Sequence, residues 1–309
     1  MVSLLFGRFL QAIVTLFVLA VIVFFLSRLS GDPIELILPV DATMADRQVL
    51  RSTLGLDRPL TEQFFLFLKG AIGGDFGTSI RERKPALDLV LSRFPASIKL
   101  ASFAMGVAIL IAFPLAVLGA VNKNGSIDII ARIVGVLGQS VPSFWSGLLL
   151  IIIFAGHFKI LPAAGTGGWS HYLLPGFTLG WFVVAGMMRL LRSSLLEVLD
   201  SEYIKLARIK GVSEFKVVCK HALRNSLIPV VTFGGVYFAA LISTAVVVET
   251  VFAWPGLGRL AYDAIGFRDF PVIQAVVLFA AFLVVISSLL VDILYAVLDP
   301  RIRIGPKTM

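Results

Sequence analysis

The sequence predicts an all-α integral membrane protein with six transmembrane helices. Of its 309 residues, 58% are apolar and only 15% are charged, whereas soluble domains average about 45–50% apolar and about 25% charged. The mean hydropathy is +0.95. A soluble chain of this length cannot bury so much apolar surface, which excludes a soluble enzyme and a disordered or fibrous chain.

Six apolar stretches are long enough to cross a bilayer core, which takes about 20 helical residues. They are residues 9–27, 100–121, 133–156, 172–188, 227–248 and 271–291. None contains Asp, Glu, Lys, Arg or His. The first stretch is longer than the apolar core of a signal peptide and no small-residue cleavage site follows it, so we expect residues 1–29 to be a retained anchor helix.

The short loops fix the expected orientation. With the N-terminus inside, the inner segments carry fourteen Lys and Arg residues, against three in the two short outer loops. Basic residues are enriched on the cytoplasmic side of a membrane. We therefore expect both termini in the cytoplasm. The net charge of +8 is explained by this orientation and does not indicate affinity for nucleic acid.

The long loop after the first span is expected outside and folded. It carries eight basic and nine acidic residues. Thr43 and Asp46 form a capping-box pattern ahead of a short helix that ends near Gly55. Pro59 can open a second helix, and residues 85–93 can form a third. The loop is either a structural cap or a docking surface for an external partner.

The absence of ionisable residues from the six predicted spans bears on how transport is powered. Transporters driven by protons usually keep an ionisable group inside the membrane, and Glu249 is expected only at the outer end of the fifth span. Sodium coupling stays open, since backbone carbonyls can hold that ion. The chain has no G-x-x-x-x-G-K-[ST] nucleotide motif and no Cys/His metal cluster. We thus expect no cofactor, metal site or catalytic residue here, and a gradient or a separate subunit as the energy source.

The inner segment 189–226 predicts two amphipathic helices joined at Gly211, which suits the position after a helix end. Ser213 suits an N-cap for the second helix, and Pro229 is expected to open the fifth span. The apolar face of the first helix is expected at Leu199, Tyr203, Leu206 and Ala207, and that of the second at Phe215, Val218, Cys219 and Ala222. Such an elbow fits a groove of another protein or lies on anionic lipid.

The same segment carries a family resemblance. Ala207-x-x-x-Gly211 followed by His221-Ala-Leu-Arg-Asn-Ser-Leu-Ile-Pro229 resembles the EAA loop of binding-protein-dependent ABC importer permeases, closest to the dipeptide/oligopeptide/nickel branch. Further blocks in the same order resemble this family: Gly31-Asp-Pro33, Leu54-Gly-Leu-Asp-Arg-Pro-Leu60, Gly74-Asp-Phe-Gly-Thr-Ser79, Glu249-Thr-Val-Phe-Ala-Trp-Pro-Gly-Leu-Gly-Arg-Leu260, Arg268-Asp-Phe-Pro-Val272 and Leu294-Tyr-Ala-Val-Leu-Asp-Pro-Arg-Ile-Arg303. Two departures are Lys205-Leu206 where the broad pattern has Glu-Ala, and Leu223-Arg224 where it has Leu-Pro.

The resemblance implies a type I ABC importer transmembrane domain in a bacterial cytoplasmic membrane, and a transport subunit without enzymatic activity. Its implied partners are a second homologous permease chain, two ATPase subunits that hold ATP and Mg²⁺, and an external substrate-binding protein. The implied domains are an anchor (1–29), an external helical loop (30–97), the permease core (98–300) with its coupling loop (189–226), and a cytoplasmic tail (301–309).

Three groups of residues are candidates for function. The ATPase-coupling candidates are Glu202, Tyr203, Ala207, Lys210, Gly211, Val212 and Glu214. The translocation-path candidates are Gln139, Ser140, Ser143, Ser243 and Thr244, which could equally form a helix-packing face. The candidates for an external gate or a binding-protein contact are Trp254, Pro255 and Gly256, with a plain interfacial Trp anchor as the alternative.

The implied substrate is a di- or oligopeptide, with glutathione-like peptides or chelated nickel as alternatives served by the same mechanism. A gradient-driven secondary transporter and a non-transporting scaffold or sensor are the competing classes. The substrate itself is not readable from this chain, since in such systems selectivity rests largely with the binding protein.

Overall fold

The computed structural model describes residues 2–29, 34, 38, 42–53 and 55–298, without the side chains of residues 2–6 and 292–298. Gly31-Asp-Pro33, Leu54, residues 299–303 and the tail 301–309 therefore lie outside the described residues. The all-α prediction is confirmed for the described part, which forms helices with an isolated antiparallel bridge between Thr78 and Pro85.

Five helical stretches are long and apolar enough to span a membrane, and a bent helix pair makes a sixth if it counts as one span. They are Gly7–Leu29, Ala86–Val121, Ser170–Leu199, Glu214–Thr244 and Phe270–Val291, with the pair Ser126–Ser140 and Ser143–His157. Each overlaps one of the six predicted stretches, so the predicted number of spans is reached with the bent pair.

The third predicted span is not one straight helix, which corrects the expectation for residues 133–156. Helix α6 (Ser126–Ser140) and helix α7 (Ser143–Leu150), which continues as a π-helical turn (Ile151–His157), meet at 107°. Pro142 has no N–H to continue the hydrogen-bond ladder, and Val141 takes an extended conformation (φ −89°, ψ 121°). The chain therefore turns sharply inside the third predicted span.

Two other helices are longer than predicted. Helix α5 (Ala86–Val121) joins the expected loop helix 85–93 to the second span in one helix of 36 residues. Likewise Pro229 does not open the fifth span but lies inside α11 (Leu223–Thr244), which continues the helical run from Glu214. A proline inside a membrane helix is tolerated when neighbouring groups satisfy the freed carbonyl.

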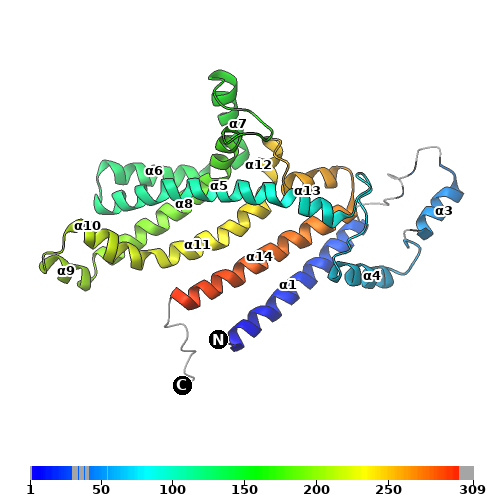
Figure 1. The fold of residues 1–309 in the computed structure, drawn as a ribbon, viewed down its shortest axis with the longest axis horizontal. Helices are drawn as coiled ribbons and strands as arrows, with labels where there is room; N and C mark the ends of the chain where they lie inside the picture. Colours follow the sequence, from blue (N-terminus) through cyan, green and yellow to red (C-terminus); the bar gives the residue numbers. More distant parts are fainter. Residues whose placement is uncertain (1, 30–33, 35–37, 39–41, 54, 299–309) are drawn as a thin grey trace. The chain divides into compact units, whose positions relative to one another are not determined.

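The chain divides into two compact units. The first holds Met1–Ser97 and Pro255–Val285, with α1 (Val2–Leu29), α3 (Met44–Thr53), α4 (Leu60–Ile72), α13 (Leu257–Gly266) and the start of α14 (Phe270–Leu298). Figure 1 shows α4 beside one end of α1, where the Phe24 ring packs on Phe64 and Phe67 at centroid distances of 5.3 and 5.5 Å. Helix α4 is thus packed against α1, so this part of the long loop is not a bare linker.

The predicted capping box is confirmed in this first unit. The Asp46 carboxylate accepts hydrogen bonds from the Thr43 N–H (3.1 Å) and hydroxyl (2.7 Å), while the Asp46 N–H donates to the Thr43 hydroxyl (3.2 Å). These reciprocal bonds satisfy donors that the start of α3 leaves open. Helix α3 ends before Gly55, which adopts φ +65° as expected for a residue after a helix end.

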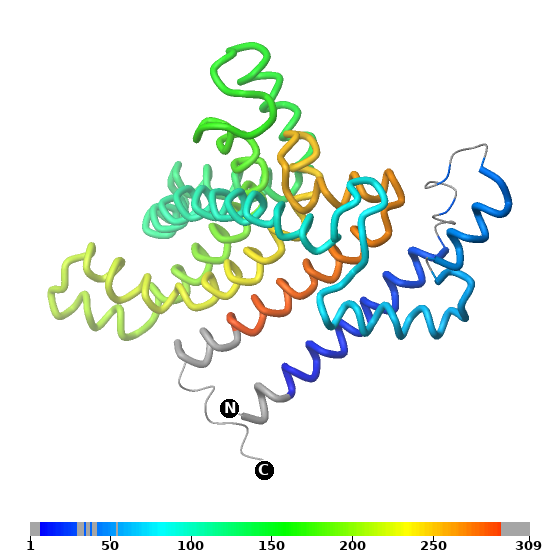
Figure 2. The backbone as a smooth tube through the Cα atoms, turned by 45° about the vertical axis from the view of Figure 1, so that its right-hand side comes forward, coloured from blue at the N-terminus to red at the C-terminus, as the bar shows by residue number. Residues whose placement is uncertain are grey.

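The second unit holds Ile98–Trp254 and Ile286–Met309, with α8 (Ser170–Leu199) between α6 and α11. Figure 2 shows α8 (green) and α11 (yellow) joined through the turn that carries α9 (Glu202–Ile209) and α10 (Glu214–Lys216). Small residues allow close packing here: a Cβ on Gly138 would lie 2.5 Å from the Ala185 Cβ. In the most apolar window of α8, 67% of residues are buried, so α8 is the core helix of this unit.

Candidate functional site

A cavity of about 530 Å³ opens in the second unit where the bent pair meets α8 and α11. Its wall is made of neutral polar, aromatic and aliphatic residues: Gly138, Gln139, Ser140, Val141, Pro142, Ser143, Ser146, Thr178, Leu179, Trp181, Phe182, Val183, Tyr237, Ala240, Leu241, Thr244 and Val248. The 107° turn at Pro142 brings the polar ends of both α6 and α7 to the same space. In a straight helix, these polar residues would lie one after another along the helix axis and would not surround a common space.

No charged side chain lines this cavity, among the residues that the structure describes. The hydroxyls of Ser146, Thr178 and Thr244 donate to carbonyls of their own helices at 2.7–2.9 Å, which leaves their lone pairs to accept further bonds. Arg189 lies near by and donates to the Gln139 amide oxygen at 2.9 Å. Such a wall can hold a polar solute by hydrogen bonds without a fixed charge.

The structure brings most of the predicted path residues together. Gln139, Ser140, Ser143 and Thr244 line the cavity. Ser243 does not line it; it is half-buried, and its hydroxyl donates to the Ala239 carbonyl. A one-residue step along a helix turns a side chain by about 100°, so the sequence alone could not decide which of the two neighbours faces the cavity.

Aromatic residues of the cavity wall were not among the sequence candidates. Trp181 and Phe182 come from α8 and Tyr237 from α11, and the rings of Phe182 and Tyr237 lie 5.7 Å apart. With 25 Phe in the chain, most aromatic residues face lipid or core, and nothing in the sequence separates these few from the rest.

The elbow between α8 and α11 forms the second feature of this unit. Helix α9 ends at Ile209, Lys210 is its C-cap residue, and Gly211 follows with φ +75°. The Val212 N–H donates to the Ala207 carbonyl (3.2 Å) and the Gly211 N–H to the Arg208 carbonyl (3.0 Å), the pair of bonds that defines a Schellman ending. The prediction that Gly211 follows the helix end is confirmed, because this backbone conformation favours a residue without a Cβ.

Two ion pairs brace the elbow. Arg208 donates to both Glu214 carboxylate oxygens, at 3.1 and 2.6 Å, across the Gly211 turn. Lys205 pairs with Glu202 at 2.8 Å. The hydrogen bond to Glu214 raises the pKa of Arg208, and the hydrogen bond to Glu202 raises the pKa of Lys205. Arg208 and Lys205 therefore keep their charge across the physiological pH range.

The exposed apolar residues of the elbow differ from the predicted faces. Leu206, Ile209 and Phe215 are exposed by 52%, 81% and 77%, whereas Ile204 is fully buried. Phe215 was expected in line with buried Val218 and is instead on the outside. Leu206, Ile209 and Phe215, around Gly211, form what we call the elbow surface. Because these three side chains are exposed, the elbow surface can contact another protein.

Two smaller expectations about the elbow are also corrected. Leu199 is the last residue of α8 and does not belong to the first elbow helix, which begins at Glu202. Ser213 stands at the N-cap position of α10 but makes no side-chain cap hydrogen bond. The exposed cysteine Cys219 also lies off the buried face formed by Val218 and its neighbours.

All seven coupling candidates lie on α9, the Gly211 turn or the first residue of α10. Ala207 and Val212 are half-buried and the other five are exposed. The Tyr203 hydroxyl accepts a hydrogen bond from the Asn225 amide at 2.8 Å, which ties α9 to the start of α11. Both arms of the elbow are thus continuous with, or bonded to, helices that line the cavity.

The segment around Trp254 is buried more deeply than expected. The Trp254 side chain is only 1% exposed and its ring lies 4.7 Å from that of Tyr172, so it packs inside the unit and is no interfacial anchor. Gly256 is buried and Pro255 half-buried. Glu249, expected at the membrane surface, is fully buried in α12 (Val246–Val251), and its carbonyl accepts from the Trp254 N–H at 2.7 Å.

Comparison with known families gives two matches that together cover nearly the whole chain. Residues 93–304 match the family described as binding-protein-dependent transport system inner membrane component. Residues 1–101 match the N-terminal region described for membrane components of the same transport systems.

Curated relatives match along almost their full length. The glutathione transport system permease protein GsiC of Escherichia coli strain K12 is 43% identical over 297 residues, covering 96% of this chain and 97% of the relative. The protein of the same name from Shigella flexneri serotype 5b is 42% identical over the same length.

Solved structures match in fold alone. A MetNI methionine ABC transporter in an inward-facing conformation aligns with a TM-score of 0.56 and 17% identity, covering 68% of this chain and 96% of that chain. An amino acid ABC transporter with histidines aligns with a TM-score of 0.54 and 15% identity, covering 68% and 94%.

Proposed function

We propose a function for this chain from one premise: it belongs to the family of binding-protein-dependent transport system inner membrane components. It is a multi-pass inner-membrane permease of a bacterial ABC importer, which sets aside the gradient-driven and scaffold alternatives. The substrate, the partner set and the roles of individual residues are the proposal. We propose that the chain imports small peptides, with glutathione as the first substrate to test.

The substrate proposal has two supports. The relative at 43% identity is named a glutathione permease, and glutathione is a tripeptide. The cavity of the second unit is lined by hydroxyl, amide and aromatic groups without a charged wall residue among those described, which suits the many amide donors and acceptors of a peptide. Di- and oligopeptides fit the same wall, and chelated nickel stays a weaker alternative.

The coupling proposal rests on one observation, which is that the elbow and the cavity share their helices. Helix α8 lines the cavity at Thr178–Val183 and runs unbroken to Leu199, a rise of about 30 Å at 1.5 Å per residue. Helix α11 lines the cavity at Tyr237–Thr244 and is tied to α9 through Asn225 and Tyr203. A displacement of the elbow must therefore move two walls of the cavity, since packed helices move as rigid elements.

We propose that the elbow surface sits in a groove of an ATPase subunit. Its apolar centre, Leu206, Ile209 and Phe215, would bury against the partner. The basic side chains beside it, Lys205, Arg208 and Lys210, would meet acidic groups at the rim. In this proposal the complete importer has a second permease chain, two ATPase subunits that bind ATP and Mg²⁺, and an external binding protein. This chain binds no cofactor itself. The Trp254-Pro255-Gly256 turn would shape the external gate through its backbone, and residues 30–97 would lie outside.

The test is uptake by the complete importer in proteoliposomes supplied with binding protein, glutathione or a dipeptide, and internal ATP. The wild-type complex should accumulate peptide against its gradient. Gly211→Arg should abolish uptake while membrane insertion and assembly of the second unit stay normal, because the side chain disturbs both the φ +75° turn and the surface beside it. Gly266→Ala, at a position with open space and no left-handed φ, should transport normally.

Two results would contradict the coupling proposal, and a third would contradict the substrate proposal. Accumulation by this chain without any ATPase subunit would exclude the coupling role of the elbow. Normal ATP-driven uptake by Gly211→Arg would remove the elbow surface from the mechanism. Transport of nickel chelates with no transport of peptides would leave the coupling intact and replace the substrate.

A further inference from the structure

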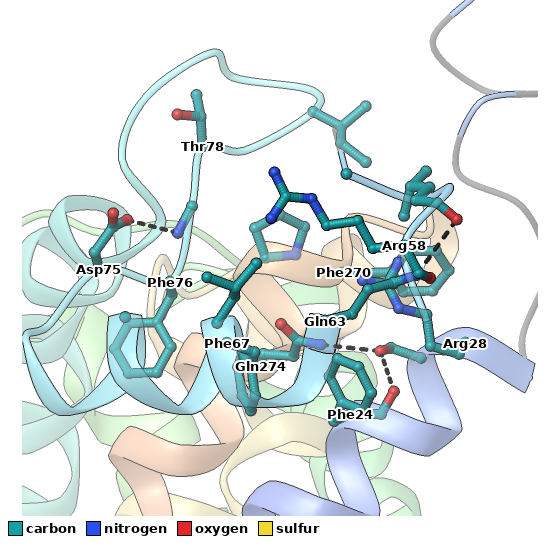
Figure 3. A pocket seen from close by; sticks show the side chains of 18 of the residues that line it. Phe24, Arg28, Arg58, Gln63, Phe67, Asp75, Phe76, Thr78, Phe270 and Gln274 are labelled. Carbon is teal, nitrogen blue, oxygen red and sulfur yellow. Dashed lines mark hydrogen bonds between the residues drawn. The ribbon is translucent and has the colours of Figure 1, made fainter. Parts of the chain in front are cut away.

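A second cavity, in the first unit, is assigned no role by the proposed transport path. It measures about 610 Å³ and is enclosed by the end of α1, the segment before and within α4, the loop that follows α4, and the start of α14. It shares no lining residue with the cavity of the second unit. Figure 3 shows its side chains in place.

The floor of this cavity is formed by the end of one apolar helix, α1, and the beginning of another, α14. Phe24, Ser27 and Arg28 come from the last residues of α1, and Phe270 and Gln274 from the first turns of α14. A span that ends in Arg places the charged group at the level of the lipid head groups. The cavity is therefore expected at the membrane surface and not within the hydrocarbon core or far out in water.

The cavity wall carries groups of both charges. Arg28 stacks over the Phe24 ring at 5.2 Å. Arg58 is about half exposed, pairs with Glu62 at 2.8 Å, and in Figure 3 extends across the mouth toward Thr78. Asp75 lies across the cavity, and one of its carboxylate oxygens accepts from the Gly77 N–H at 2.9 Å.

Gln63 supplies an acceptor that the described residues leave unused. Its side chain is 8% exposed and lines the cavity. The amide nitrogen donates to the Arg58 carbonyl at 2.8 Å and to the Leu56 carbonyl at 3.3 Å, which fixes the orientation of the amide. The amide oxygen is buried and has no hydrogen-bond partner. A buried acceptor without a donor is unfavourable, so the ligand of this cavity should bring an N–H or O–H group.

The apolar surroundings favour a lipid over a soluble ligand. Phe25, Leu26 and Leu29, beside the cavity on α1, are exposed by 42%, 59% and 82%, and Leu66, Phe67 and Phe76 line the cavity itself. Exposed apolar residues at the end of a membrane helix offer a continuous surface for acyl chains. A short peptide would leave this surface uncovered.

We propose that this cavity binds the head group of a phospholipid that carries a primary ammonium, such as phosphatidylethanolamine. The phosphate accepts hydrogen bonds from the guanidinium groups of Arg28 and Arg58. The ammonium donates to the Gln63 amide oxygen and to the Asp75 carboxylate. The acyl chains follow the exposed side of α1. The bound lipid would fasten the external-loop helices to the anchor helix at the membrane surface.

The experiment measures lipid retention by the complete importer, purified in detergent, stripped of lipid and then titrated with defined phospholipids under native mass spectrometry. The probes are phosphatidylethanolamine, phosphatidylcholine and phosphatidylglycerol with identical acyl chains. Phosphatidylethanolamine should be retained roughly fivefold more strongly than phosphatidylcholine, the ratio expected for about one net hydrogen bond, because a trimethylammonium group has no N–H. Phosphatidylglycerol should also bind more weakly, because its hydroxyl groups can donate to the Gln63 amide oxygen but it has no ammonium to pair with Asp75.

Two variants, each with a matched control, test whether Gln63 and Asp75 recognise the ammonium group. Gln63→Leu should bring the ratio of ethanolamine to choline lipid close to one, while Gln48→Leu, at an exposed glutamine of the same loop, should leave it unchanged. If Gln63→Leu does not assemble, Asp75→Asn decides: it keeps an acceptor for the Gly77 N–H, removes the charge, and should lower the ratio severalfold, whereas Asp57→Asn should not.

Three outcomes would overturn the proposal. The wild-type protein could retain both lipids equally, Asp75→Asn could keep the wild-type ratio, or a peptide could occupy the cavity in place of lipid. Each of these is separate from transport, so the proposed function stands or falls on its own test.

Discussion

The Ser79 hydroxyl donates a hydrogen bond of 2.5 Å to the carboxylate of Asp269, although 190 residues separate the two in the chain. Both side chains are buried. The same carboxylate accepts from the backbone N–H groups of Ile80 (3.2 Å) and Arg81 (3.3 Å). Two sequence blocks that carried the family resemblance separately, one ending at Ser79 and one containing Asp269, thus form one clasp within the first unit.

Asp269→Ala should destabilise the first unit, because three donors lose their acceptor at once. We expect the free energy of unfolding to fall by about 2–3 kcal/mol, in line with the penalty for buried unsatisfied groups. The measurement is chemical or thermal unfolding of the purified protein in detergent. Glu82→Gln, at an exposed carboxylate of the same turn, should stay within about 0.5 kcal/mol of wild type. An equally stable Asp269→Ala protein would mean that the clasp does not hold this unit.

The capping box predicts a pH dependence of helix α3. Hydrogen bonds from the Thr43 hydroxyl and N–H hold the pKa of Asp46 below its ordinary value of 3.8. A carboxyl whose folded pKa is depressed stabilises the fold above its unfolded pKa and loses that contribution as the pH falls through the folded value. Amide exchange of α3, corrected for intrinsic rates, should therefore accelerate below about pH 4. Thr43→Val should remove this pH step, and a step that persists in the variant would point to another group.

Asp128 should hold α6 on α8. The carboxylate is fully buried and pairs with Arg192 at 2.5 Å and with Arg132 at 3.0 Å. Asp128→Asn leaves Arg192, only 20% exposed, without its counter-ion, and we expect a loss of about 2–3 kcal/mol in unfolding free energy. Asp200→Asn, at an exposed aspartate after α8, is the matched control. Equal melting temperatures for the two variants would contradict the role of the buried pair.

Close packing of α6 on α8 gives a prediction with its own rescue. A Cβ on Gly138 would approach the Ala185 Cβ to 2.5 Å, so Gly138→Ala should push the helices apart, destabilise the second unit by about 1–3 kcal/mol and reduce uptake through the altered cavity. The double variant Gly138→Ala with Ala185→Gly restores the space and should recover most of both losses. Failure of the double variant to recover stability would show that Gly138 is needed for another reason.

Features that depend on nearby residues were predicted well from the sequence. The spans, the capping box at Thr43 and Asp46, and the position of Gly211 after a helix end all follow from local composition, helix length and capping chemistry. The sharp bend in the third span was not predicted, because a proline such as Pro142 shows where a helix can break but not the angle between the two parts. Phe215 was misplaced, because amphipathic spacing identifies an apolar face without saying whether that face is buried or awaits a partner.

The sequence by itself determined that this chain crosses a membrane several times, carries no nucleotide motif of its own and exposes an elbow around Gly211, since apolar length and local turn chemistry need no information from distant parts of the chain. Only the tertiary structure decided that Ser79 meets Asp269, that Thr244 and not Ser243 faces the cavity, and that Gln63 keeps a buried acceptor open. These facts depend on helix rotation and on contacts between residues far apart in sequence, and many sequences with the same pattern could place them differently.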